Sequence, residues 1–344
     1  FKLNGKLPPH VMAKDFILKI IGDIGNDGGA YNTMQFGGTG IDGINQNPSG
    51  GNTYDGLNFN YGDSHRGEII VDSTGNCYIG TTTTTSNLTG VLGSYGGNQD
   101  GLILKLDSNL TTLLWGRYLG GTGRDAIYSL KVIDSNKVLV GGGTTSYDDF
   151  PVTANSYQSS SLQSRSVTRE QADGFVSILS ADGSTVEKST YISTSNYDQV
   201  YFVEFDRFNN IYAYGQTQGG LFPILRAPRA NAGAGQFIVK LDRNLDSLEF
   251  STTFGNGGGV GRVNISPTAF LVDKCQNIYA SGWGEEIIGP DPFGNPGEGD
   301  KSITNMLVVN NRDPTIPTST NSTDGNDFYL YVINRNVDSV LYAS

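Results

Sequence analysis

The stretch Asp100-Gly-Leu-Ile-Leu-Lys-Leu-Asp-Ser-Asn-Leu-Thr-Thr-Leu-Leu-Trp-Gly-Arg-Tyr-Leu-Gly-Gly121 recurs in variant form along the chain and predicts its fold. Leu102, Leu104 and Leu106 occupy every second position, which is the pattern of a β-strand with a buried face. Residues 107–109 follow as a polar segment whose short side chains bond the local backbone and favour a turn. The stretch therefore predicts two antiparallel strands joined by a tight turn and closed by a Gly-Gly pair.

Copies of this hairpin alternate with a second module, which reads as a strand, an Asp-led turn and another strand ending near a glycine. The hairpin copies lie at 173–183, 235–245 and 327–337, with a looser one at 15–20 followed by 36–43. The second module is led by Asp72, Asp134, Asp206 and Asp273. The intervals between these aspartates are unequal, which indicates constant strands connected by loops of variable length.

Four strands in each repeat of roughly 60–90 residues are the sequence signature of a β-propeller, in which neighbouring four-stranded sheets stack to bury their faces. The sequence predicts an all-β chain of four-stranded antiparallel blades, with about four complete blades plus a split half blade. The predicted segments are an N-terminal extension at 1–14, a half blade at 15–43 and blades at about 62–121, 125–193, 198–256 and 261–344. Because strand direction alternates, the long loops between second and third strands are all expected on one face.

The third strand of each blade is expected to bury alternate residues, while the Thr81–Thr85 tract is expected to face water. Replacement of Leu104 by alanine should therefore cost roughly 2–5 kcal/mol, and replacement of Thr83 less than about 0.5 kcal/mol. The predicted buried positions are Leu102, Leu104, Leu106, Phe175, Leu179, Phe237, Val239, Leu241, Tyr329, Tyr331 and Ile333. Residues 44–62, rich in Asn and Gly, are expected to form a surface loop.

The composition limits the classes of partner. A net charge of −11 without a Lys/Arg-rich cluster argues against nucleic acid and anionic lipid, both of which require grouped cations. No window holds the ~18 apolar residues of a membrane span, so no membrane insertion is expected. Cys77 is expected to be a buried thiol, and the two cysteines are too few for a zinc site. Phe1 in place of an initiator Met suggests a processed chain or a fragment of a longer parent.

Two motifs resemble a known repeat family. They are similar to the bacterial β-propeller repeat called SBBP. With φ for an apolar residue, the first is Asp-Gly-φ-φ-φ-Lys-φ-Asp with a trailing Leu-Gly-Gly-Thr-Gly, and the second is φ-Asp-x-x-Gly-Asn-φ-Tyr-φ. The segments 62–78 and 265–283 resemble large surface proteins of Bacteroidetes that are associated with gliding motility and exported by the type IX secretion system. The resemblance implies an exported or cell-surface protein, extracellular in location, and the type IX sorting domain of such proteins is not found in this sequence.

The expected function is a non-catalytic propeller module that serves as a scaffold or as an adhesion and recognition domain. Its partners would be proteins or glycans at the loop-rich face and other domains of a longer parent chain. The alternative is a propeller enzyme, a lyase or hydrolase, that acts on glycans through the same face. The weak candidates for a ligand-binding or catalytic group are Asp63, His65, Arg66 and Glu68, which lie close together before a predicted strand.

No cofactor is expected, with Ca²⁺ as the one possibility that the sequence leaves open. Oxygen-rich turns at Asp23 and Asp27, and at Asp72 and Asn76, offer ligands that calcium accepts, although neither matches a defined calcium loop. Residues 5–22 also resemble a segment of the aconitase and isopropylmalate dehydratase large subunits. The iron–sulfur cluster of that family needs three cysteine ligands, whereas this chain contains two cysteines.

Overall fold

The chain is an all-β propeller-type protein, seen here in a computed structural model. The structure describes residues 37, 40, 42–45, 56–60, 62–163, 171–219, 222–256, 262–284, 301–309 and 327–344. Within these ranges the only helices are the 3₁₀ turns η1 (Asp63–His65) and η2 (Asp134–Asn136). The predicted extension 1–14, most of the predicted half blade, and the calcium candidates Asp23 and Asp27 lie outside the described residues.

Four antiparallel sheets follow one another along the chain, each with its four main strands in sequence order. Blade 1 contains β1 (Glu68–Val71), β2 (Cys77–Thr83), β4 (Asp100–Leu106) and β5 (Leu113–Leu119), with β3 (Val91–Leu92) added at its outer edge; blade 2 contains β6 (Asp125–Val132), β7 (Val138–Thr144), β8 (Asp173–Leu179) and β9 (Val186–Ile192). Blade 3 contains β10 (Asp198–Phe205), β11 (Ile211–Thr217), β12 (Gln236–Leu241) and β13 (Leu248–Phe254); blade 4 contains β14 (Ser266–Val272), β15 (Ile278–Trp283), β16 (Phe328–Ile333) and β17 (Val340–Ala343).

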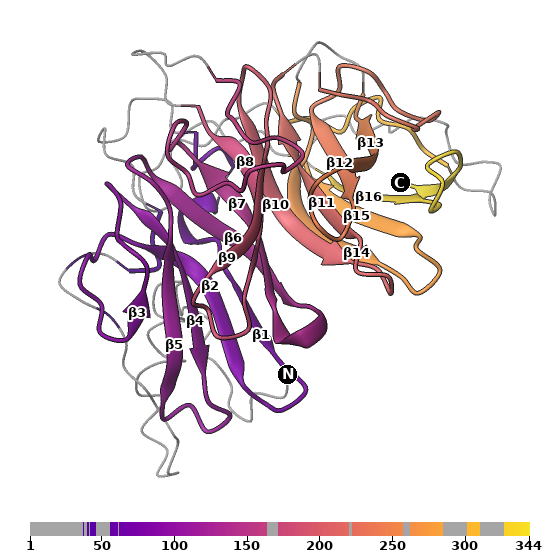
Figure 1. Cartoon of the computed structure of the whole chain (residues 1–344). Coiled ribbons are helices and arrows are strands. Elements are labelled where there is room, and N and C mark those ends of the chain that lie inside the picture. Colours follow the sequence, from indigo (N-terminus) through magenta and orange to yellow (C-terminus); the bar gives the residue numbers. More distant parts are fainter. Residues whose placement is uncertain are drawn as a thin grey trace, which may run out of the picture.

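The first strand of each blade makes the contacts that join the blades. β6 packs against β1, β2 and β4, β10 packs against β6, β7 and β8, and β14 packs against β10 and β11. The sheets therefore stand side by side in chain order with their first strands innermost (Figure 1). The long loops between second and third strands lie on one face, the loop-rich face. The tight turns between first and second strands, and between third and fourth, lie on the opposite, short-turn face.

The predicted third-strand core is confirmed, because every residue predicted to be buried there is at most 2% exposed. The opposite pleat differs from the expectation of a single buried face. Ile103, Val176 and Ile238 point to that other side and are fully buried as well. Blades 2 and 3 have a neighbouring blade on both faces, whereas blade 4 leaves Phe328 on that pleat 61% exposed. Lys105 and Lys240, also on that pleat, reach water in part.

Glycines on the second strands allow the blades to approach closely. A Cβ atom at Gly80 would lie 2.6 Å from a methyl group of Leu130, and one at Gly141 would lie 2.6 Å from a methyl group of Val203. Both contacts are to the following blade, and both distances are too short for a real Cβ atom. The recurrent glycine of the second module is therefore a packing requirement between blades.

The threonine tract is buried, so the prediction that it faces water is wrong. Thr81, Thr82 and Thr83 lie within β2 and are at most 3% exposed. The Thr83 hydroxyl donates a hydrogen bond to Asp42, which pairs with Thr83 as an isolated bridge. The tract is buried because the second strand lies inside the blade, and the Thr83 hydroxyl is the one of these three that bonds the start of the first strand.

The long inserts fold back over the outer strands. β3 pairs with β5 in blade 1, and Leu225 and Val309 form bridges with the outer strands of blades 3 and 4. In blade 2, the Thr153 N–H donates to the Ser189 carbonyl at 3.0 Å. The inserts thus supply hydrogen bonds to strand edges that would otherwise be open.

The Asp-led turn is a recurring network in blades 1, 3 and 4, and blade 2 departs from it. In blade 1, the Asp72 carboxylate accepts the Asn76 N–H at 3.0 Å and the Thr74 N–H at 2.9 Å. In blade 2, the backbone bond that closes the turn begins at Ile133, one residue before Asp134. The predicted equivalence of Asp134 with the other leading aspartates is therefore wrong by one position.

Candidate functional site

Asp63, His65 and Arg66 belong to a segment inserted into the innermost strand of blade 1, and Glu68 begins β1 directly after it. Asp42 and Gly43 pair with Thr83 and Thr82 as the start of that strand, and β1 resumes the pairing with Glu68 opposite Gly80. The other blades have only a β-bulge at this place. Blade 1 has the segment 44–67 instead, and we refer to its described residues 44–45, 56–60 and 62–66 as the axial plug.

The axial plug is buried against the first strands of the other blades, so the expectation of a surface loop at 44–62 is wrong for these residues. Leu57 is fully buried and Phe59 is 2% exposed. The Leu57 carbonyl accepts a hydrogen bond from the Tyr128 hydroxyl at 2.6 Å, and Phe59 stacks on Tyr197 with ring centroids 4.1 Å apart. Apolar and amide side chains of the plug replace water on the inner side of the blades.

Asp63 is the charged centre of the plug and is fully buried. Its carboxylate pairs with the Arg66 guanidinium at 3.1 Å and accepts hydrogen bonds from the Tyr201 hydroxyl at 2.7 Å and the Asn60 N–H at 2.8 Å. Burial raises the pKa of Asp63, while Arg66 and the hydrogen bonds oppose that rise. Every one of these partners is part of the fold, so the group acts here as a structural anchor.

Arg66 connects blade 1 to blades 3 and 4. Its guanidinium donates to the Pro267 carbonyl at 3.1 Å and lies 4.8 Å from the centre of the Tyr201 ring. A cation above an aromatic face gains electrostatic attraction that increases when the pair is shielded from water. These contacts of Arg66 join the plug to blades 3 and 4.

His65 and Glu68 are directed elsewhere. His65 Nδ1 lies 2.7 Å from the Ser64 hydroxyl within the same 3₁₀ turn. Glu68 accepts the Leu130 N–H at 2.7 Å and pairs with Lys131 at 2.6 Å, both in blade 2. The structure thus brings Asp63 and Arg66 together, while Glu68 serves the contact between blades 1 and 2.

Asp72 and Asn76, the described calcium candidates, form a self-contained turn. Besides the two backbone bonds, the Asp72 carboxylate accepts the Asn76 amide at 3.0 Å and the Thr74 hydroxyl at 2.7 Å. Although partial burial opposes it, this set of donors lowers the pKa of Asp72 to about 2. Asp206 and Asp273 make matching contacts with Asn210 and Asn277, so the motif recurs as a turn. Across the described parts of the chain, no group of three or more His, Cys, Asp or Glu is placed to hold a metal ion.

Sequence reasoning missed the polar residues that surround the plug. The Gln216 amide exchanges hydrogen bonds with Asn60 at 3.0 and 3.1 Å, and Gln99 donates to Asn45 at 2.7 Å. Tyr128 and Tyr201 occupy the bulges of β6 and β10, where their hydroxyls point to the plug. A tyrosine at the same place in both strands was a readable signal, but its partner is distant in the sequence.

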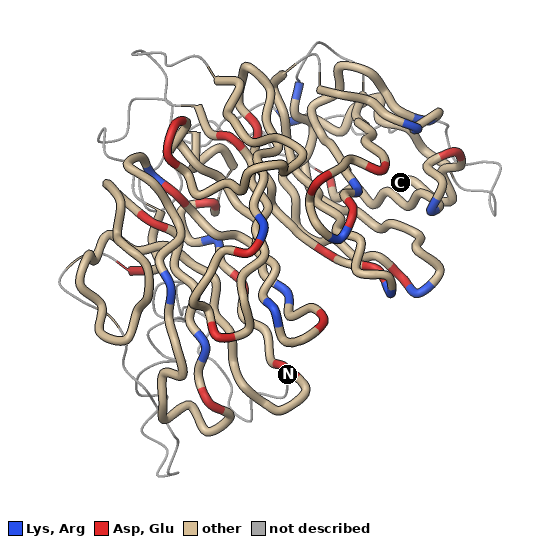
Figure 2. Tube along the Cα trace, in the orientation of Figure 1, with Lys and Arg blue, Asp and Glu red and all other residues tan. Residues whose placement is uncertain are grey.

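Charge is distributed without a dominant cationic surface. Figure 2 shows the Lys and Arg residues of the described chain interspersed with Asp and Glu along the trace. Lys240, for example, lies 3.3 Å from Asp206 and 2.9 Å from Glu249. Both cysteines are free, Cys77 buried as predicted and Cys275 exposed, and burial raises the pKa of the Cys77 thiol to about 11. In the part of the chain that the structure describes, no helix is long and apolar enough to cross a membrane.

Comparison with known sequences yields matches to short segments. No protein-family model matches the chain. The 3-isopropylmalate dehydratase large subunit of Helicobacter hepaticus is 58% identical over 41 residues, which cover 12% of this chain and 10% of that protein. The corresponding subunit of Clostridium kluyveri is 61% identical over 41 residues, with the same coverage of 12% and 10%. The chain thus spans about a tenth of the length of the curated relatives that it matches.

Comparison with solved structures gives distant likenesses. A quinohemoprotein alcohol dehydrogenase from Pseudomonas putida HK5 has a TM-score of 0.36 at 12% identity, covering 82% of this chain and 34% of its own. PorZ, a surface component of the type IX secretion system of Porphyromonas gingivalis, has a TM-score of 0.30 at 11% identity, and the match covers 81% of this chain and 39% of PorZ. CoXyl43, a β-xylosidase/α-arabinofuranosidase from a compost metagenome, has a TM-score of 0.33 at 12% identity, and the match covers 87% of this chain and 91% of CoXyl43. The fold assignment accordingly rests on the strand pairing of the chain itself.

Proposed function

We propose that this chain is a non-catalytic propeller module of an exported or cell-surface bacterial protein, which presents its loop-rich face to protein or glycan partners. The observation that carries the proposal is the role of the charged candidates. Asp63, Arg66 and Glu68 have their charges engaged by partners inside the fold. The clustering of these charged residues before a strand is thereby explained by blade assembly, and no catalytic role is needed to account for it.

Two further features support the proposal. The motifs quoted above resemble SBBP repeats, and two segments resemble surface proteins associated with type IX export and gliding motility. The four inserts also leave one face and return to the outer strands, as at Leu225 and Val309, so they form a rim fixed by backbone pairing. Binding residues are often carried on loops that a rigid scaffold positions.

The test is a binding and turnover assay on the same glycans. Purified chain is applied to an array of bacterial and host glycans, and each bound glycan is then incubated with the protein and examined for cleavage by mass spectrometry. We expect binding without cleavage, and we expect Leu162→Asp, at an insert side chain that is 58% exposed, to weaken it. Asp182→Asn, in an exposed turn of the short-turn face, is the matched control.

Glycan cleavage that is lost in Asp63→Asn, with folding intact, would replace this proposal by the alternative of a glycan-active enzyme. Export has its own test, since antibody against the chain should label intact cells of the source bacterium. Labelling only after lysis would contradict a surface location. Binding that is unchanged by Leu162→Asp and lost in Asp182→Asn would show that the recognition surface lies on the short-turn face.

A further inference from the structure

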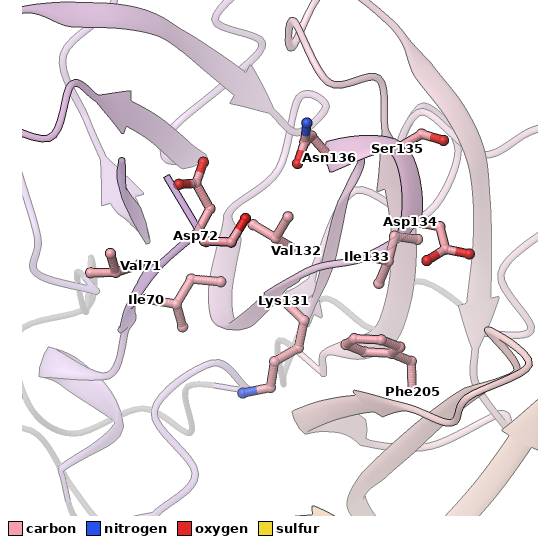
Figure 3. Close-up of a pocket in the computed structure, with 11 residues that line it drawn as sticks. Ile70, Val71, Asp72, Lys131, Val132, Ile133, Asp134, Ser135, Asn136 and Phe205 are labelled. Carbon is pink, nitrogen blue, oxygen red and sulfur yellow. The ribbon is translucent and has the colours of Figure 1, made fainter. Parts of the chain in front are cut away.

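A pocket of about 520 Å³ opens on the short-turn face between blades 1 and 2, and Phe205 of blade 3 closes one side of it. Figure 3 shows Val132 and Ile133 lying between the carboxyl groups of Asp72 and Asp134. This pocket lies on the face opposite the long inserts. It is therefore independent of the function proposed for the loop-rich face.

The pocket exists because blade 2 lacks the turn network of its neighbours. In blade 3 the corresponding place holds Asp206, whose carboxylate takes Asn210 at 3.0 Å and Lys240 at 3.3 Å. Blade 2 has Ile133 where the other blades have the leading aspartate, and Ile178 where Lys240 stands. Ile133 therefore lines the pocket with an apolar side chain where the other blades have a carboxylate.

The turn that replaces the network is strained. Ser135 and Asn136 have φ values of 61° and 60°, a left-handed conformation that L-residues other than glycine seldom adopt. The turn holds Asp134 one position beyond the usual aspartate, where its carboxylate accepts the Asn209 amide of blade 3. Asn209 and Gln276 have the same conformation at the place of Asn136 in blades 3 and 4, so Ser135 is the left-handed residue peculiar to blade 2.

The electrostatic balance of the pocket is acidic. Lys131 is the one cation among the lining residues, and its ammonium is paired with Glu68 at 2.6 Å and lies 3.6 Å from Glu204. Glu68 and Glu204 thus offset the one ammonium group, and the carboxylates of Asp72 and Asp134 stand apart from it at the rim. A ligand with a positive charge is therefore favoured over a neutral or an anionic one.

The walls suit a ligand whose charge is carried on an apolar stem. Ile70, Ile133 and Phe205 offer partly exposed apolar surface, and Val71 at the rim is 43% exposed. A guanidinium group stacks on aromatic rings and is weakly hydrated, whereas an ammonium group retains its water more strongly. Its planar donors also match a carboxylate such as Asp134.

We propose that this pocket binds an arginine side chain of a protein partner, with the stem on Ile133 and Phe205 and the guanidinium at Asp134. The partner is thus a protein with an exposed, basic segment. The negative charge of the pocket favours the guanidinium group, and its apolar wall favours the hydrocarbon stem.

The experiment follows backbone amide NMR signals of the ¹⁵N-labelled chain during titration with N-acetyl-arginine amide. We expect saturable shifts centred on residues 132–136, which decrease as NaCl is added. N-acetyl-citrulline amide is the matched probe, because it keeps the shape of arginine without the charge. We expect it to bind at least roughly threefold more weakly, as the loss of a charge-assisted hydrogen bond implies.

Variants separate charge from shape. Asp134→Asn should weaken arginine amide roughly two- to fivefold, in the range of an exposed ion pair, and Val71→Trp should abolish the shifts by filling the mouth. Asp148→Asn on the loop-rich face is the control and should bind like wild type. Equal binding of citrulline amide, shifts centred outside the pocket, or unchanged binding by a folded Val71→Trp protein would each overturn the proposal.

Discussion

The junction between blades 1 and 2 and the junction between blades 3 and 4 each contain buried polar side chains at the starts of strands, which we call the polar layer. The first junction uses carboxylates there and the second uses amides. At the first, Asp100 begins β4 and Asp125 begins β6, and both are fully buried. At the second, Gln236 begins β12 and Asn264 stands just before β14, also buried. The backbone frame is shared, since Asp125 accepts the Gly121 N–H at 2.9 Å and Asn264 accepts the Asn256 N–H at 3.0 Å.

The carboxylate junction leaves two oxygen atoms without partners, whereas the amide junction satisfies its groups. A Cβ atom at Gly120 would lie 2.5 Å from one oxygen of Asp125 and 2.9 Å from Asp100, so the two carboxyl groups face the same small space. The Oδ1 atoms of both have no hydrogen-bond partner. By contrast, Asn264 donates through Nδ2 to the Ser302 carbonyl at 2.9 Å.

This difference predicts a dependence on pH that belongs to only some junctions. Burial raises the pKa of Asp125 to about 7 and that of Asp100 to about 6, and it raises the pKa of Asp173 at the next junction to about 7. These groups bind more protons in the folded than in the unfolded state between about pH 4 and pH 7. Their contribution to stability is therefore present at about pH 4 and is lost as the pH rises to 7.

The largest effect is expected outside the junctions, in the apolar cluster that Leu104 forms with other residues of blade 1. Leu104→Ala removes a side chain that is 2% exposed and leaves a cavity, so it should lower the free energy of unfolding by roughly 2–5 kcal/mol. Because no charge is involved, the loss should be equal at pH 5 and pH 8 in urea titrations. A pH-dependent loss would show that the core and the carboxylates are coupled.

Next in size is the conversion of the amide junction into a carboxylate one. Asn264→Asp buries a charge in place of a satisfied amide, so it should lower the free energy of unfolding at pH 8 by about 3 kcal/mol. At pH 5 the new carboxyl group can be protonated, and the loss should be smaller. An equal loss at both values, measured by denaturant titration, would contradict a role for the charge.

The reverse exchange should stabilise the protein. Asp125→Asn keeps an acceptor for the Gly121 N–H and removes the buried charge, so it should raise the free energy of unfolding at pH 8 by about 2 kcal/mol. The gain should vanish near pH 4, where the wild-type group is already neutral. Melting temperatures from pH 4 to 8 measure this, and a pH-independent difference would refute the assignment.

The smallest effect concerns Thr83, which lies at the end of β2 in blade 1. Thr83→Val keeps the shape of the side chain but removes the hydroxyl that donates to Asp42 and accepts the Thr85 N–H at 2.8 Å. We expect a loss of about 1 kcal/mol, in the range for single buried hydrogen bonds. Thr112→Val at an exposed position is the control for propensity. A cost no greater than that of the control would mean that Asp42 does not depend on this bond.

The sequence by itself determined the repeat, the four-stranded blade and the buried side of its third strand. These features are local, because alternation along a strand and turn residues at its ends act within a few neighbours. Leu104 and Phe237 are buried as the period-two pattern requires. The Asp-led turns at Asp72, Asp206 and Asp273 were equally readable as local motifs.

Only the tertiary structure decided which residues meet between blades. The insertion that becomes the axial plug looked like a polar loop, since its partners Tyr201, Gln216 and Pro267 lie more than a hundred residues away. Burial of the second pleat of the third strand, as at Val176 and Ile238, follows from neighbouring blades and from no pattern within one. Sequence periodicity reports the contacts of a single sheet, whereas charge, burial and pocket shape depend on surfaces that come together only when the sheets stack.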